Sequence, residues 1–303
     1  MAFNAATILK RGLYILSIAW ENESMDNQIK HFKKHYGSSH DALADMWNDL
    51  ITTQIPGLVL NEKEKSGWGL DFFLRAHYFL FTYPKNTEQF AKRFDIGLSY
   101  AQGKPLWSWI ERISMLKHIK IKWEARLNEP HPAQFVISVD GTDMKIDEVQ
   151  HDDEPVNRGY YSHKINHGAV KYEIALSIFE PRCVWMNGPH PGGKHDITIL
   201  REGGLLDKIA LGDLVIADRG YRTSVPHEQR KLSLPNRLGN AEVEKLKSRA
   251  RSRHESFNGR IKNFNVLYET YRHDIKIKHK LAFEAVVVTV QYQMDNGSPI
   301  FDV

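Results

Sequence analysis

The pattern of apolar and polar positions changes character near residue 130. Before it, apolar residues recur at helical spacing and alternating β-branched residues are scarce. The apolar run 70–81 predicts a helix at the centre of a small helical core. Pro130 and Pro132 then mark a boundary, and beyond it the pattern is typical of strands. We therefore expect a helical region over residues 1–130, followed by an α/β domain over 131–303.

The N-terminal region contains a helix-turn-helix-like segment at about residues 84–113. TEQFAKRF, residues 87–94, places Phe90, Ala91 and Phe94 on one helical face. A short turn then separates it from a second helical segment that opens at 98–100. A plain helical hairpin has the same pattern. The sequence therefore leaves open whether this segment reads DNA or only supports the helical core.

Two short β-branched runs in the second domain each lead into an acid. Residues 135–139 are followed by Asp140 and Gly141, and residues 214–217 are followed by Asp218. Such runs predict buried strands, and we expect the first strand to stop at Asp140. Because a lone carboxylate is costly to desolvate, each acid is expected to meet a cation or several hydrogen-bond donors.

The remaining pattern predicts the rest of a sheet and a long helix. A hairpin over 160–178 and a strand over 182–187 follow the first run, which gives three neighbouring antiparallel strands. From residue 241 the periodicity is helical, and Glu255 lies well off the apolar stripe among arginines. That stripe comprises Leu246, Ala250, Phe257, Ile261 and Phe264.

Composition excludes several classes of protein. A single cysteine, Cys183, rules out an internal disulfide framework and a cysteine zinc site. The sequence contains no run of about 18 apolar residues, so no membrane-spanning helix is predicted. The net charge of +4 conceals an uneven distribution, because residues 241–280 contain eleven Lys and Arg against five Asp and Glu. Such a local basic field attracts polyanions.

The chemistry suggested by the three acids is metal-dependent. Asp140, Asp218 and Glu255 are 78 and then 37 positions apart, and converging carboxylates cannot all stay ionised without compensation. All-oxygen ligation suits Mg²⁺ or Mn²⁺. Two such ions, roughly 3.5–4 Å apart, clamp the attacking and leaving oxygens of a phosphodiester displacement.

The motifs resemble the DDE superfamily endonuclease domain of PIF/Harbinger-type transposases over roughly residues 130–300. The resemblance rests on DGTD at 140–143, YSHK at 161–164, YE at 172–173, the loop 187–196, ADRGY at 217–221 and RHESFNG at 253–259. It implies an RNase H-like mixed sheet flanked by helices, with Asp140, Asp218 and Glu255 as the catalytic, metal-binding triad. It also implies Mg²⁺-dependent cleavage of double-stranded DNA and strand transfer.

Other polar residues are candidates for supporting roles. Asp143 and Asp196 could support the metal ligands, although a turn or hydrogen-bonding role for Asp143 and a helix cap at Asp196 are the simpler interpretations. Arg219 could pair with Asp218 or contact DNA. The remaining candidate DNA contacts are Lys164, His195, Lys247, Arg249, Arg251, Arg253, Arg260 and Lys262.

Three functions are compatible with these features. The first is a DNA transposase, and the second is a domesticated, catalytically inactive descendant that binds DNA. A phosphohydrolase of small substrates would need neither the basic segment nor the helix-turn-helix-like region. Cleavage at two transposon ends predicts a homo-oligomer, with an accessory DNA-binding protein as a further partner. We expect a nuclear location in a eukaryote and a cytoplasmic one otherwise; KSRARSRH at 247–254 resembles a nuclear signal.

Overall fold

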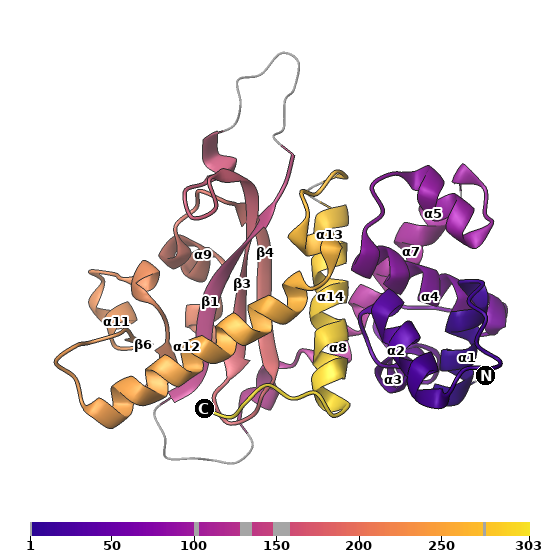
Figure 1. Cartoon of the computed structure of the whole chain (residues 1–303). Coiled ribbons are helices and arrows are strands. Elements are labelled where there is room, and N and C mark those ends of the chain that lie inside the picture. Colours follow the sequence, from indigo (N-terminus) through magenta and orange to yellow (C-terminus); the bar gives the residue numbers. More distant parts are fainter. Residues whose placement is uncertain (1, 100–102, 128–134, 148–157, 275–276) are drawn as a thin grey trace. The chain divides into compact units, whose positions relative to one another are not determined.

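The computed structural model describes residues 2–99, 103–127, 135–147, 158–274 and 277–303 (Figure 1). Its contacts divide the chain into two units. The helical unit comprises Met1–Lys120, Ile261–Glu269 and Ile277–Pro299, and the sheet unit comprises Ile121–Arg260, Thr270–Lys276 and Ile300–Val303. The predicted domains were continuous in sequence, whereas in the structure the C-terminal helix groups with the N-terminal helices.

The helical unit is built from helices, and α1 to α5 each begin with a side-chain cap. Its helices are α1 (Ala5–Ile15), α2 (Met25–Tyr36), α3 (His40–Thr52), α4 (Gly67–Thr82), α5 (Thr87–Phe94), α7 (Lys104–Met115), α8 (Lys117–Lys120), α13 (Asn265–Tyr268) and α14 (Lys278–Asp295). Ser39, which caps α3, accepts a hydrogen bond from the backbone of Ala42, as an N-cap serine commonly does. The predicted apolar helix lies within α4, where Phe73 and Leu74 are fully buried. No helix among the described residues is long and apolar enough to cross a membrane.

The helix-turn-helix-like segment is described only in part. α5 buries Phe90, Ala91 and Phe94, and it ends at Asp95 in the left-handed conformation. A second helical segment begins at Leu98, but residues 100–102 lie outside the described residues. Its DNA-reading role stays a prediction.

The sheet unit has an RNase H-like mixed sheet. Its strands are β1 (Phe135–Lys145), β2 (Tyr161–Ser162), β3 (His167–Ser177), β4 (Cys183–Pro191), β5 (Leu214–Ile216) and β6 (Leu232–Ser233). β3 pairs antiparallel with β1, β2 and β4, while β5 runs parallel to both β1 and β6. The predicted α/β class and the three antiparallel strands are therefore confirmed.

The prediction that the first strand stops at Asp140 is wrong. β1 continues through Gly141 as far as Lys145, and Asp143 still pairs with Lys171 of β3. The reason is tertiary, because an eleven-residue β3 supplies backbone partners beyond the acid. Asp140 is therefore held inside a regular strand instead of at a turn.

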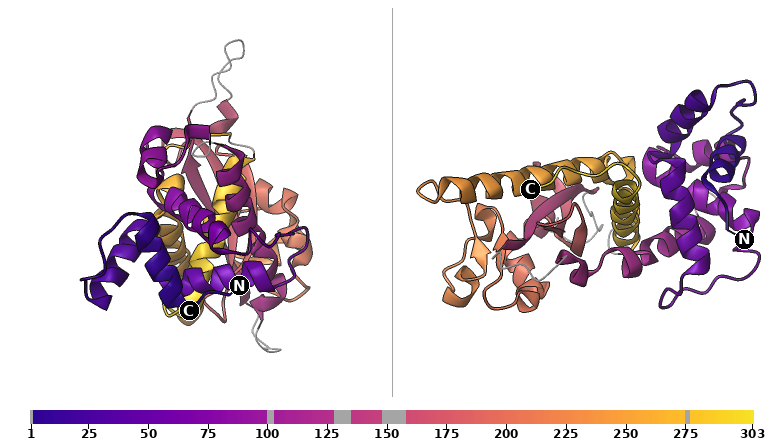
Figure 2. Two further views of the ribbon diagram at one scale, coloured as in Figure 1. Left: turned by 90° about the vertical axis from the view of Figure 1, so that its right-hand side faces the viewer. Right: turned by 90° about the horizontal axis from the view of Figure 1, so that it is seen from below.

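Helices cover both faces of the sheet. α12 (Ala241–Lys262) crosses one face (Figure 1; Figure 2, right), where Ala250 packs with Ile178 and Ile216. The other face packs against α9 (Asp196–Glu202) and α10 (Leu205–Lys208). Short elements complete the unit: η1 (Trp123–Arg126), η2 (Arg158–Tyr160), η3 (Arg219–Tyr221) and α11 (Pro226–Gln229). Because side chains alternate along β1, Asp140 faces α12 and Gly141 faces α9.

Candidate active site

Asp140 lies on β1, and Asp218 follows the end of the neighbouring parallel strand β5 by two residues. Ser138 of β1 is level with Ile216, the last residue of β5, and beyond these two residues the charge of Asp218 acts on Asp140. Neighbouring strands are about 4.8 Å apart. Asp218 also caps η3, since its Oδ1 accepts a hydrogen bond of 2.8 Å from the Gly220 backbone. The sheet therefore brings together two acids that are distant in sequence.

Asp140 is a carboxylate in a poorly solvated position. Burial raises its pKa to about 6, the charge of Lys164 opposes that shift, and the nearby carboxylates of Asp218 and Asp196 add to it. The amide nitrogen of Asn258, from α12, donates a hydrogen bond of 3.1 Å to Oδ2 of Asp140. The backbone of Gly141 is a second donor to this carboxylate. Neutral donors offset only part of the cost of burying an ionised group, so this position favours a cation.

Glu255 lies on α12, on the same side of the helix as two residues that lie next to Asp140 or Asp218. Arg251, four residues before it, lines a pocket with Asp218, and Asn258, three residues after it, contacts Asp140. Residues with these spacings lie next to one another on a helix. Glu255 is exposed. Among the described residues, no three His, Cys, Asp or Glu side chains lie close enough together to hold a metal ion. The structure thus brings Asp218 close to Asp140, while Glu255 forms no metal-binding cluster with them among the described residues.

Asp196 does not cap a helix, contrary to the prediction. The cap position belongs to His195, and Asp196 is the first residue of α9. Its Oδ1 accepts a hydrogen bond of 3.0 Å from the Nζ of Lys171. A Cβ atom at Gly141 would lie 2.9 Å from Oδ1, and one at Gly220 would lie 2.5 Å from Oδ2. The Asp196 carboxylate is therefore wedged between the backbones that carry Asp140 and Asp218, and only glycine leaves it room.

Asp143 and Lys171 extend this polar layer on the α9 side of the sheet. Asp143 is buried, and its Oδ2 accepts a hydrogen bond of 3.1 Å from Ser162. Its Oδ1 lies 4.0 Å from the Nζ of Lys171. Burial raises the pKa of Asp143, and the charge of Lys171 is the largest opposing effect. This lysine thus serves both Asp143 and Asp196 from within the sheet.

Glu173 is a buried acid that the sequence patterns do not single out, because it appears there only within the YE motif at 172–173. Its side chain is fully buried on the same face. Burial raises its pKa to about 8, the nearby Trp185 indole opposes the shift, and the charge of Asp196 adds to it. The signal available in the sequence was a charged residue in the middle of an apolar strand.

Several predicted DNA contacts need correction. Arg253 is fully buried and its guanidinium donates to the carbonyl of Ser177, while burial lowers its pKa to about 10. Lys247 is 6% exposed, and its Nζ donates to the carbonyl of Leu234 at 3.0 Å and to Glu244. Neither side chain is available to DNA, because both lie on the part of α12 that faces the sheet unit.

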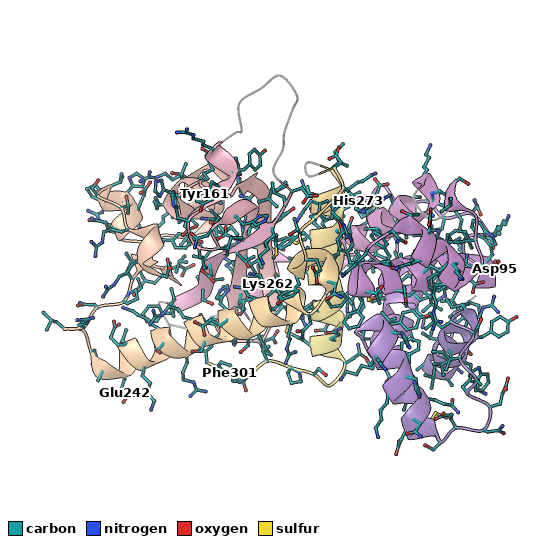
Figure 3. The ribbon with its side chains drawn as sticks, turned by 45° about the horizontal axis from the view of Figure 1, so that its top comes forward. Asp95, Tyr161, Glu242, Lys262, His273 and Phe301 are labelled. Carbon is teal, nitrogen blue, oxygen red and sulfur yellow. The ribbon has the colours of Figure 1, made fainter. Side chains whose placement is uncertain are left out.

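The remaining basic candidates are more accessible. Lys164, His195, Arg219 and Arg249 are exposed, and Arg251, Arg260 and Lys262 are half-buried. Lys164 is the cation whose charge acts most strongly on Asp140. Figure 3 shows the side chains along α12 from Glu242 to Lys262.

One comparison with known proteins gives a match. The family model described as "DDE superfamily endonuclease" matches residues 139–290, half of the chain, and this range contains Asp140, Asp218 and Glu255. No curated protein and no solved structure matches.

Proposed function

The chain belongs to the DDE superfamily endonucleases, and from this premise we propose that it cleaves and joins DNA phosphodiester bonds by a two-metal mechanism. Asp140, Asp218 and Glu255 are the proposed catalytic ligands. The observation that carries the proposal is that Asp218, two residues beyond the parallel strand β5, lies close enough to Asp140 of β1 for its charge to raise the pKa of Asp140.

The chemistry of the site fits hard divalent cations. All three proposed ligands supply oxygen, which suits Mg²⁺ or Mn²⁺. The raised pKa of Asp140 marks a carboxylate that a bound cation would keep ionised. Asp140, Asp218 and Glu255 would together hold the ions. When bound, the ions would supply charge stabilisation for an in-line displacement at phosphorus.

The side chains around the proposed ligands have different roles. Asn258 orients the Asp140 carboxylate through its 3.1 Å hydrogen bond. Lys171 holds Asp196, which in turn fixes the spacing of the Gly141 and Gly220 backbones. The exposed Lys164 places a positive charge close enough to act on Asp140, and this charge would attract a phosphate.

The proposed substrate, assembly and partners follow from this chemistry. We propose a PIF/Harbinger-type transposase whose substrate is double-stranded DNA at transposon ends, and whose 3′-hydroxyl product is joined to target DNA. Two ends require two active sites, so a homo-oligomer is the expected assembly, with an accessory DNA-binding protein as a further partner. In a eukaryote it would act in the nucleus. A mass measurement that gave only monomer, both with and without DNA, would contradict the oligomer.

The test is nicking of supercoiled plasmid in Mg²⁺ or Mn²⁺, with DNA binding followed in parallel. The variants are Asp140→Asn, Asp218→Asn and Glu255→Gln. Glu242→Gln is the matched control, because Glu242 is an exposed acid near the start of the same helix. We expect the three variants to lose cleavage and keep binding, and the control to keep both. Undiminished cleavage by any of the three would remove that residue from the mechanism.

A catalytically silent DNA-binding protein is the alternative, and one observation favours it. The described acids do not form a closed metal cluster. This alternative predicts DNA binding by the unmodified chain with neither nicking nor Mn²⁺ uptake. Paramagnetic resonance of titrated Mn²⁺ separates the two functions, since the transposase requires uptake that Asp140→Asn abolishes.

A further inference from the structure

A pocket opens next to Asp218 on the sheet unit. It lies between η3, the loop of residues 234–240 and the first turns of α12, and its volume is about 700 Å³. Arg219, Arg237 and Arg251 line it from these three segments. Segments distant in sequence thus converge to present three guanidinium groups beside a proposed metal ligand.

The acids in the pocket wall are occupied by other partners. Glu244 accepts hydrogen bonds from the Nζ of Lys247 at 2.7 Å and from the backbone of Asn236 at 2.9 Å. Asp218 accepts one from Gly220. Within the described part of the chain, no carboxylate forms an ion pair with any of the three arginines that line the pocket. Their positive charge is therefore available to an anionic ligand, and Arg219 is not paired with Asp218.

The N-terminus of α12 adds to the positive field. Ala241, the first residue of this 22-residue helix, lines the pocket. Asn240 accepts hydrogen bonds from the backbones of Glu242 and Val243, so the ligand would feel the helix dipole without needing those two donors. A helix N-terminus favours phosphate groups, and here it coincides with arginines from other elements.

The loop carries an exposed apolar tip. Leu238 is 96% exposed and stands between Arg237 and Gly239. Within the loop, the side chain of Asn236 accepts a hydrogen bond of 3.1 Å from the Leu238 backbone. An apolar side chain held beside cationic groups matches the way proteins insert aliphatic residues against bases while binding phosphates.

We propose that this pocket binds the phosphodiester backbone of a DNA strand next to the scissile position, with Leu238 against its bases. Arg219, Arg237 and Arg251 contact the phosphates. The inference rests on the proposed function for the position of the cut, but the binding site itself can be tested without cleavage. Phosphate contacts of this kind hold the strand in register and are independent of base sequence.

Binding is measured by fluorescence anisotropy of a labelled DNA duplex in EDTA between 50 and 200 mM salt. The variants are Arg237→Ala, Arg251→Ala and Arg237→Lys. Arg230→Ala is the control, because Arg230 is an exposed arginine outside the pocket. Each alanine variant in the pocket should weaken binding and reduce the slope of log K against log salt by about 0.9, the loss of one phosphate contact. The control and Arg237→Lys should keep the slope.

Leu238→Ala provides an independent test, because its side chain is exposed and folding does not depend on it. Binding should weaken with an unchanged salt slope, since an apolar contact releases no counterions. If the pocket variants behave like Arg230→Ala, the proposal is overturned.

Cleavage then separates this inference from the proposed function. If the site is correct and the function is wrong, the slope changes appear but the unmodified chain never nicks DNA. If the function is correct and the site is wrong, nicking persists in all pocket variants with wild-type salt slopes. If both are correct, Arg237→Ala needs more DNA for half-maximal nicking and approaches the wild-type rate at saturation.

Discussion

Replacing Glu173 by glutamine should stabilise the sheet unit at neutral pH. Glu173 is fully buried in β3, and burial raises its pKa to about 8. In the folded chain it is therefore protonated near pH 7, whereas an unfolded chain has an ordinary glutamate with a pKa near 4.3. Folding must take up a proton, and that uptake costs free energy that glutamine avoids.

The sign follows from proton linkage. Between about pH 4.5 and pH 8 the unfolded state binds fewer protons than the folded state, so stability falls as the pH rises and levels off above pH 8. One proton changes the free energy of unfolding by about 1.4 kcal/mol per pH unit. The advantage of Glu173→Gln over the wild type should therefore grow by about 4 kcal/mol, to order of magnitude, between pH 5 and pH 8.

The assay compares the two proteins directly across this range. Hydrogen exchange of β3 amides under denaturant reports the stability of the sheet unit, and the difference cancels histidine titrations that both proteins share. These include buried His254, whose pKa burial lowers to about 4. Glu242→Gln, at an exposed position, should show no such trend. A difference independent of pH would mean that Glu173 is ionised in the folded protein, which would refute the reasoning.

Three further substitutions test the packing around the site. Gly220→Ala places a Cβ atom 2.5 Å from the Asp196 carboxylate and should reduce plasmid nicking about 100-fold. The control is Gly259→Ala, whose Cβ atom would meet no atom within 4 Å. It should keep nicking and gain about 1 kcal/mol of helix stability in urea unfolding. Arg253→Ala should lose about 3 kcal/mol of unfolding free energy because it empties a buried site, while Arg249→Ala at the surface should change it by less than about 0.5 kcal/mol. Asp140→Asn should abolish nicking without lowering the urea midpoint, since it removes a desolvated carboxylate.

Local periodicity was sufficient to predict most elements of the sheet unit. The apolar run before Asp218 contains β5, and the paired strands β2 and β3 lie within the hairpin predicted over 160–178. The end of β1 could not be predicted in this way. Asp140, Gly141 and Asp143 look like a turn in isolation, and only pairing with β3 keeps them extended.

The polar layer behind the site was beyond sequence reasoning for a different reason. Asp196 meets Gly141 and Gly220 only because α9 packs on the sheet, and no local pattern encodes that contact. Arg253 did have a signal. It lies three residues after Ala250 and four before Phe257, so helical periodicity already pointed it toward the buried stripe.

The two paired acids and Glu255 are positioned by different means. The β1–β5 ladder ends two residues before Asp140 and Asp218, and the Asp196 carboxylate lies against both Gly141 and Gly220, which follow these acids by one and two positions. Glu255 stands on an exposed flank of α12, where its side chain keeps rotamer freedom. A rigid pair of acids bears the electrostatic cost of convergence, visible in the raised pKa of Asp140. Glu255 is exposed and does not share that burial. This difference in burial explains why the three proposed ligands do not form a closed cluster among the described residues.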